Sequence, residues 1–360
     1  EQWVEDIVRF GIKPIIGYSS SSQKSWKKNL VQAVRSFNLH VSDFFCFITT
    51  NASFVTKTVQ DQITLLSEDV VFVVDDNIGA TNYRRYLPEN IKYRLGLSAT
   101  IDRHNDESGT TALSEYFGAK CIIYSLKNAI DSKMLTRYYY YPVLTYLDQD
   151  ELSDYLSITG QLAKAIHKKN GKVVLTEHAK QLLIKRSRIV AGAKGKLPEL
   201  QRQIAPYIDD KHILVYCGAT TVRDEDDADF GKRQIDLVAE LLGNTLNMRV
   251  GRFTSRESAQ ERAQIREAFA EGNALQALVA IKCLDEGVNI PSIKTAFILA
   301  SSTNPKEYIQ RRGRVLRKFP GKEFAVIYDF ITLPFPVNTI TTQSDAIIDS
   351  TKGLIKRELI

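Results

Sequence analysis

Short, uninterrupted apolar runs recur along the chain and alternate with amphipathic stretches, and this rhythm restricts the fold more than any other feature. Apolar runs without polar alternation predict strands that are covered on both faces, and the amphipathic stretches predict crossover helices. The expected fold class is therefore α/β with parallel sheets. The expected strands are residues 44–49, 70–74, 94–98, 212–217, 248–253, 277–281, 295–300 and 323–330. The expected helices are residues 25–37, 56–66, 151–168, 175–193, 232–242, 258–270 and 305–312.

The chain is too long for one ordinary domain, since 360 residues exceed the roughly 100–200 residues of a typical domain. Residues 1–130 and 196–332 each show the alternating pattern and are expected to form two α/β domains. Residues 131–195 are expected to form an extended and helical connector, and residues 333–360 a C-terminal tail. The four consecutive tyrosines Tyr138 to Tyr141 fit two structures, a surface that stacks on bases and an edge strand packed on a domain.

Net charge and cysteine content limit the kinds of partner and the cellular compartment that are expected. The net charge of +6 is compatible with a polyanionic partner, and equally with a solvated surface. The four cysteines, Cys46, Cys121, Cys217 and Cys283, are far apart in apolar surroundings, so we expect buried free thiols in a reducing compartment, the cytoplasm. No apolar run approaches the roughly 20 residues of a membrane span, so no membrane partner is expected.

The densest local signal is Gln310-Arg311-Arg312-Gly313-Arg314-Val315-Leu316-Arg317. Arg311, Arg314 and Arg317 recur at steps of three, which on a helix would place them on similar faces. Guanidinium groups stay charged and fork toward phosphate oxygens, so the segment is a candidate phosphate site. Gly313 within such a helix suggests a close approach by another group.

Further candidate residues stand at the ends of expected strands, where parallel α/β sheets bind ligands. Four apolar residues lead to Asp75 and Asp76, and a carboxylate in that position is suited to Mg²⁺ beside a nucleotide. Ser98 and Thr100 end another strand. Asp285 and Gly287 follow the strand at 277–281, where an ordinary turn is an equal alternative.

Together and in this order, these segments resemble the motifs of superfamily-two helicases, most closely the DEAD/DEAH-box helicases associated with restriction and phage-defence systems. The resemblance covers about residues 1 to 332. The matching stretches are Gln2-Trp3 (motif Ia), Ile48-Thr49-Thr50-Asn51 (Ib), Ser98-Ala99-Thr100 (III), residues 213–219 (IV), residues 284–291 (V) and residues 310–317 (VI).

The resemblance implies two RecA-like domains that bind ATP between them and nucleic acid across both, with DNA favoured over RNA and defence-system proteins as further partners. Asp75 would hold Mg²⁺, and Arg314 and Arg317 would be arginine fingers. Asp285, Gly287, Gln310 and Arg311 would lie at the nucleotide. Thr49, Thr50 and Thr254 would contact the sugar–phosphate backbone, and Ser98 and Thr100 would couple the two sites.

Two departures from the family bear on activity. The chain contains no Gly-x-x-x-x-Gly-Lys-Ser/Thr phosphate loop, and its nearest imitation, at residues 192–197, has the wrong spacing. We expect the loop to lie before residue 1, so that the first domain is incomplete and this chain alone is inactive. Asp76 stands where the family has the glutamate that orients water, and it is one methylene shorter.

The sequence therefore leads to an ATP-dependent helicase or translocase. The alternative is an inactive module that only binds nucleic acid. A dehydrogenase is poorly supported, because no Gly-x-Gly-x-x-Gly follows an early strand.

Overall fold

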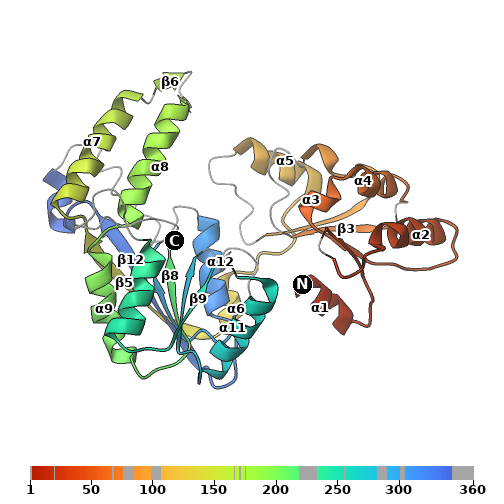
Figure 1. The fold of residues 1–360 in the computed structure, drawn as a ribbon. Helices are drawn as coiled ribbons and strands as arrows, with labels where there is room; N and C mark the ends of the chain where they lie inside the picture. The colour runs from red at the N-terminus through yellow and green to blue at the C-terminus, as the bar shows by residue number, and fades with distance from the viewer. Residues whose placement is uncertain are drawn as a thin grey trace. The chain divides into compact units, whose positions relative to one another are not determined.

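The computed structural model describes two compact units, Glu1–Ile123 and Tyr124–Ile360 (Figure 1). The first domain was expected to extend to residue 130. The residues described are all except 1, 20, 67–68, 76–83, 99–106, 166, 170–171, 175, 219–232, 255–256, 282–289, 301–304 and 343–360.

The first unit combines short helices with two separate pairs of parallel strands. Its elements are α1 (Gln2–Arg9), β1 (Ile15–Gly17), α2 (Trp26–Asn38), β2 (Phe47–Thr49), α3 (Asn51–Phe54), α4 (Lys57–Ile63), β3 (Val71–Asp75), a 3₁₀ turn (Arg84–Tyr86), β4 (Tyr93–Leu97) and α5 (Glu107–Phe117). β1 pairs with β2, and β3 pairs with β4. A small core around Trp26, Leu30, Val34, Phe54 and Val59 joins α2, α3 and α4.

The β3–β4 pair is covered on only one face, which corrects the expectation that these strands are buried on both. On the covered face, Phe72 stacks on Phe54 with ring centroids 5.6 Å apart. A Cβ on Gly96 would lie 3.1 Å from the ring of Phe117, so α5 packs tightly there. The opposite face carries a set of exposed apolar side chains, which we call the open face: Val71, Val73, Tyr93, Leu95 and Leu97.

The second unit is built on a six-stranded, fully parallel sheet with the order β5-β12-β11-β8-β10-β9. Its strands are β5 (Arg137–Tyr146), β8 (Ile213–Cys217), β9 (Val250–Phe253), β10 (Ala277–Ile281), β11 (Thr295–Ile298) and β12 (Phe324–Leu333). β5 contains the four tyrosines and pairs along its whole length with β12. Of the two structures considered for this segment, the edge strand is confirmed, and residues expected in a connector extend the sheet.

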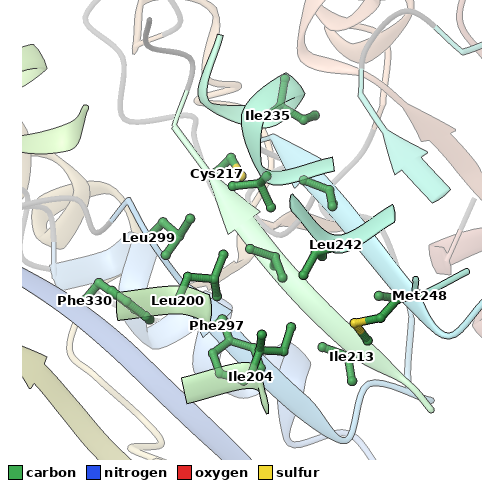
Figure 2. Close-up of a cluster of buried hydrophobic side chains, with 14 of the residues drawn as sticks. Leu200, Ile204, Ile213, Cys217, Ile235, Leu242, Met248, Phe297, Leu299 and Phe330 are labelled. Atoms are coloured by element: carbon green, nitrogen blue, oxygen red, sulfur yellow. The ribbon is translucent and has the colours of Figure 1, made fainter. Parts of the chain in front are cut away.

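Helices cover both faces of this sheet. They are α6 (Leu126–Asp131), α9 (Lys196–Ile204), α10 (Gln234–Glu240), α11 (Ala259–Glu271) and α12 (Pro305–Val315), with a π turn at Leu241–Thr245 and 3₁₀ turns at Ala205–Tyr207 and Val337–Thr342. α6, α11 and α12 pack on one face, and α9 and α10 on the other. Figure 2 shows the core between the sheet and the layer of α9 and α10, in which Leu200 and Ile204 of α9 lie against Phe297 and Phe330 of the sheet. The expected α/β fold with a parallel sheet is confirmed for this unit, whose sheet has a helix layer on each face.

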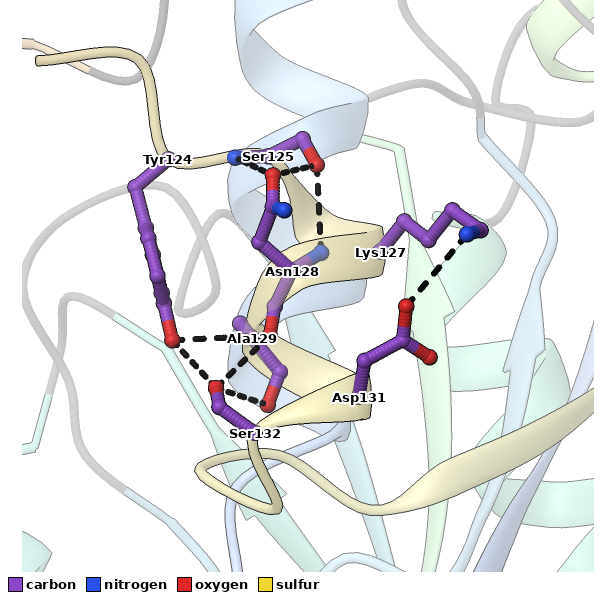
Figure 3. Close-up of polar contacts among 7 residues, drawn as sticks. All are labelled: Tyr124, Ser125, Lys127, Asn128, Ala129, Asp131 and Ser132. Atoms are coloured by element: carbon purple, nitrogen blue, oxygen red, sulfur yellow. Dashed lines mark hydrogen bonds and ion pairs between the residues drawn. The ribbon is translucent and has the colours of Figure 1, made fainter.

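Helix ends in this unit follow local capping chemistry. α6 begins with a capping box in which the Ser125 side chain accepts from the backbone N–H of Asn128, whose own side chain accepts from the Ser125 backbone (Figure 3). α11 begins with the same device at Ser258 and Glu261, and it ends at Gly272, whose φ of 71° suits glycine.

A helical hairpin leads away from the sheet and consists of α7 (Gln149–Ala165) and α8 (Glu177–Ala191) (Figure 1). At its tip the two helices are joined by an antiparallel ribbon of two strands, β6 (His167–Lys169) and β7 (Lys172–Val174). Leu162, Ala179 and Leu182 form a core of its own between the helices. At the root, buried Glu151 accepts from the backbone N–H groups of Asp148 and Lys194, and burial raises the pKa of this carboxyl. In the part of the chain that the structure describes, no helix is both long and apolar enough to cross a membrane.

Candidate nucleotide and nucleic-acid site

The arginine-rich segment forms α12, which follows β11 past the carboxyl end of the sheet. Arg311 is only 4% exposed, and its guanidinium lies over the ring of Tyr216 on β8, 4.4 Å from the centroid. Its Nη1 donates to the carbonyl of Ala300 at 3.1 Å. Stacking and hydrogen bonding thus place Arg311 inside the unit, although it was predicted to lie at the nucleotide.

Arg312 makes a parallel contact with the edge strand. Its guanidinium lies 4.4 Å from the ring centroid of Tyr140 on β5. The Tyr140 hydroxyl donates to Oδ2 of Asp329 at 3.1 Å, and Asp329 is 1% exposed in β12. Two neighbouring arginines of α12 are therefore stacked on two tyrosines of the sheet, from strands that are not adjacent.

The helix ends at Val315, so Arg317 lies beyond it, and the prediction that three arginines share one helical face is wrong for Arg317. Arg317 instead forms an antiparallel bridge with Leu135. Thr136 donates to the Leu316 carbonyl from both its backbone N–H, at 2.8 Å, and its hydroxyl, at 2.6 Å. The segment leading into β5 therefore fixes the carboxyl end of the arginine helix.

Lys322 also binds the carboxyl end of α12. Its Nζ donates to the carbonyls of Val315, Arg317 and Pro291 at 2.5, 2.8 and 3.2 Å. An ammonium has three N–H donors, so each carbonyl receives one. Burial lowers the pKa of Lys322 to about 8, and the side chain is therefore still charged at neutral pH. Sequence reasoning missed this residue, because an isolated lysine gives no signal of burial.

Gln310 and Arg314 are half-buried on α12. A Cβ built on Gly313 would meet no atom within 4 Å, so the close approach expected at this glycine is absent within the described part of the chain. Asp285 and Gly287 lie outside the described residues.

Other predicted residues lie at the carboxyl ends of β8 and β9. The hydroxyl of Thr254, just after β9, donates to the carboxylate of Glu257 at 2.9 and 3.0 Å, and its backbone N–H donates to the same group at 2.6 Å. After β8, the N–H of Gly218 donates to Oε1 of Gln234 at 2.8 Å. The imitation of a phosphate loop is structural: Lys196 is buried, and its Nζ donates to the carbonyls of Ala191 and Leu299.

In the first unit, Asp75 ends β3 with an exposed carboxylate. Its Oδ2 accepts from the indole Nε1 of Trp3 on α1 at 2.8 Å, a contact that the sequence did not suggest. Ser98, after the paired strand β4, is also exposed. Asp76 and Thr100 lie outside the described residues.

The two threonines expected to contact nucleic acid follow β2. Thr49 donates through its hydroxyl to the Gly17 carbonyl at 2.7 Å. Thr50 is the N-cap of α3, where its hydroxyl accepts from the backbone N–H of Ser53. Both hydroxyls therefore already have a local structural role.

The cysteines only partly match the expectation of burial. Cys217 is buried, Cys46 is half-buried and Cys121 is exposed, while Cys283 lies outside the described residues. Cys121 precedes two exposed isoleucines, so its apolar neighbourhood in the sequence did not indicate an interior position.

Comparisons with known proteins show what the second unit is similar to. Residues 208–319 match the family described as "Helicase conserved C-terminal domain". The chain is 23% identical over 256 residues to a DNA 3'-5' translocase, XPB2, from Sulfurisphaera tokodaii. That match covers 67% of this chain and 53% of the relative, so the chain spans about half the length of the curated relative.

Solved helicase structures are similar at low sequence identity. The Hef helicase domain of Pyrococcus furiosus is 16% identical, with 91% of this chain and 83% of that chain covered and a TM-score of 0.49. The C-terminal part of the Fun30 ATPase domain is 12% identical, with 55% and 86% covered and a TM-score of 0.40. The family match runs from β8 to α12, so this part of the second unit is similar to the conserved C-terminal domain of helicases.

Proposed function

We propose that this chain is most of the motor of an ATP-dependent helicase or translocase that moves on nucleic acid, with DNA favoured over RNA. The observation that carries the proposal is α12, an arginine-rich helix fixed at the carboxyl end of a parallel sheet, within the residues that match the helicase family. Arg314 is assigned as the arginine finger, and Arg317 as the second phosphate contact. Gln310, Asp285 and Gly287 are assigned to the same nucleotide site.

The chemistry of Asp75 suits Mg²⁺. The ion usually takes one or two carboxylates together with water and phosphate oxygens, and Asp75 offers an exposed carboxylate at a strand end. Trp3 donates to one of its two oxygens and so restrains the orientation of the carboxylate. When bound, Mg²⁺ would neutralise charge on the phosphates of ATP. Asp76 is assigned to positioning the attacking water, and Ser98 and Thr100 to coupling between ATP and nucleic acid.

The helical hairpin supports a polyanionic partner. Residues 161–191 contain eight lysines and arginines and a single acidic residue, Glu177. Lys164, Lys180, Lys185 and Arg188 are exposed along the two helices. Such a concentration of positive charge favours the phosphate backbone of nucleic acid. Thr49, Thr50 and Thr254 are the further assigned contacts.

The assignment of the finger is tested in the whole protein that contains this chain. Arg314→Ala should lower nucleic-acid-stimulated ATP turnover by about a thousandfold or more, the usual contribution of an arginine finger. Arg314→Lys should also fail, because an ammonium cannot replace the forked contact. Turnover at the unchanged rate in both variants would contradict the assignment.

The alternative function is a module that binds nucleic acid without hydrolysing ATP. The absence of a phosphate-loop motif in these 360 residues and the aspartate at position 76 favour it for the chain by itself. ATP turnover by this chain would exclude the alternative. Salt-sensitive nucleic-acid binding without turnover would support it, with an affinity that falls steeply between 50 and 200 mM salt by roughly 10³-fold or more for six phosphate contacts.

A role in restriction or phage defence, with defence proteins as partners and a cytoplasmic location, rests on the sequence resemblance alone. Co-purification of the whole protein from its host, followed by identification of the bound proteins, tests it.

A further inference from the structure

Among the described contacts of α12, the pairing of Arg312 with Tyr140 joins the arginine helix to the edge of the sheet. Tyr140 contacts the guanidinium through its ring, and its hydroxyl donates to the buried Asp329. Tyr140 therefore cannot rotate away without breaking a hydrogen bond to a buried carboxylate, a loss that is costly in the interior. The ring is thus a fixed platform for the arginine.

The position of Arg312 on the helix lets the Tyr140 ring restrain the backbone near Arg314. Arg312 lies two residues before Arg314, and the Thr136 contact to Leu316 lies two residues after it. Both contacts come from the same segment, residues 136–140, which leads into and forms the start of β5. The backbone at Arg314 is therefore held from both sides by one element of the sheet.

We propose that Tyr140 is a positioning residue for ATP hydrolysis: it orients α12 through Arg312 so that Arg314 meets the phosphates in a fixed geometry. Tyr140 itself touches no reacting atom. The inference rests on the proposed function, since it needs Arg314 to act on ATP. A shift of about 1 Å in a catalytic group can lower a rate by about a hundredfold, so loss of the platform should affect kcat.

The test uses the whole protein and compares kcat with KM for ATP. Tyr140→Leu removes the platform and should lower kcat by about tenfold or more with KM nearly unchanged, because binding of ATP does not need the fixed geometry. Tyr140→Phe keeps the ring but loses the hydrogen bond to Asp329 that fixes it, so it should lower kcat by less than Tyr140→Leu does. Arg312→Lys keeps the charge but loses the flat stacked surface, and should lower kcat as Tyr140→Leu does.

Tyr138→Leu is the matched control for mere loss of stability. Tyr138 lies two residues earlier on β5, on the same face, and packs against the same core. It should leave kcat unchanged. In the double variant Tyr140→Leu/Arg312→Lys, the loss in kcat should not exceed that of the more impaired single variant, since the two residues act as a pair.

A second readout uses this 360-residue chain without ATP. Hydrogen–deuterium exchange of residues 309–316 should be faster in Tyr140→Leu than in Tyr138→Leu. Equal kcat values in those two variants, or additive losses in the double variant, would overturn the inference. If Arg314→Ala leaves turnover unchanged, the proposed function fails instead, whatever the tyrosine variants show.

Discussion

Two strands with nearly the same apolar pattern, β3 in the first unit and β8 in the second, have opposite surroundings. Ile213–Cys217 is buried at every position, whereas Val71–Asp75 alternates, with Val71 62% exposed and only Val74 buried. Both strands belong to parallel ladders. β8 has a strand on each side and helices on both faces, while among the described residues β3 pairs only with β4, and its open face has no cover.

An uninterrupted apolar run therefore predicts that a strand is able to lie in an interior. It does not predict that other parts of the same chain cover the strand. Parallel strands are ordinarily covered on both faces. The side chains of the open face, such as Val73 and Leu95, are those of an interior strand. Apolar side chains of the β3–β4 pair and of the six-stranded sheet should therefore differ sharply in how much each contributes to stability.

The largest contrast is expected from one substitution made in both sheets. Leu278 on β10 is fully buried, whereas Leu95 on β4 is 37% exposed. Leu278→Ala should lower the free energy of unfolding of the second unit by about 2–5 kcal/mol, because it leaves a cavity in a closed core. Leu95→Ala should cost less than about 1 kcal/mol, since the methyl groups removed already contact water.

Urea unfolding measures the two units separately. Both tryptophans of the chain, Trp3 and Trp26, lie in the first unit, so tryptophan fluorescence follows that unit alone. Hydrogen–deuterium exchange of β10 and β11 follows the second. Similar losses in the two variants would show that the open face is covered in solution, by self-association for example, and would remove the contrast.

Much of the second unit could be predicted from its sequence, because its local signals and its packing agree. The strands at 213–217 and 277–281 match the apolar runs, and α11 starts at the capping box of Ser258. Pro305 is the first residue of α12, as its fixed φ predicts. In the first unit β2, β3 and β4 coincide with predicted runs, whereas β1 (Ile15–Gly17) was not predicted. The burial of β3 and β4 was not predicted either, because burial depends on what packs against a strand.

The candidate site was harder to predict, because spacing along the chain does not show which arginines pack inside the second unit. Arg311, Arg314 and Arg317 look equivalent in the sequence, yet Arg311 is stacked on Tyr216 and Arg317 follows the helix end. Two residues that fix the helix, Tyr140 and Thr136, are distant from it in sequence, and the third, Lys322, follows Arg317 by five residues but belongs to none of the helicase-like motifs. Only the sheet order, which places β5 beside β12, brings Tyr140 and Thr136 to the helix.

The next largest effect is expected at Lys322, which tests whether the second unit depends on a buried charge. Lys322→Met keeps the length of the side chain but leaves the carbonyls of Val315, Arg317 and Pro291 without this donor. The loss should be about 2–3 kcal/mol in the unfolding of the second unit, with no change in the tryptophan transition. Lys318→Met, at an exposed position nearby, is the control and should cost less than about 0.5 kcal/mol. Equal losses would mean that the three hydrogen bonds add nothing to stability.

The smallest effect concerns pH and compares two histidines that share an unusual backbone. His212 and His40 have φ angles of 64° and 55°, a region that asparagine also tolerates. His212, in the second unit, lies between Phe269 and Phe319 and contacts the Ala270 carbonyl through Nε2, whereas His40, in the first, is exposed. Burial lowers the pKa of His212 below its ordinary 6.5, and the positive charges of Lys211, Lys294 and Lys322 act in the same direction.

A lowered pKa means that the unfolded chain takes up the proton first, so the second unit should lose stability as the pH falls below 6.5. The loss should be less than about 1 kcal/mol, because the imidazole is only partly buried and solvent screens it. His212→Asn should remove this part of the acid sensitivity, whereas His40→Asn, which makes the same change in an exposed loop, should leave the pH profile of the second unit as it is. Urea midpoints for β10 and β11, measured by hydrogen–deuterium exchange between pH 5 and 8, provide the comparison. An unchanged acid slope in His212→Asn would assign the sensitivity of the second unit to other groups.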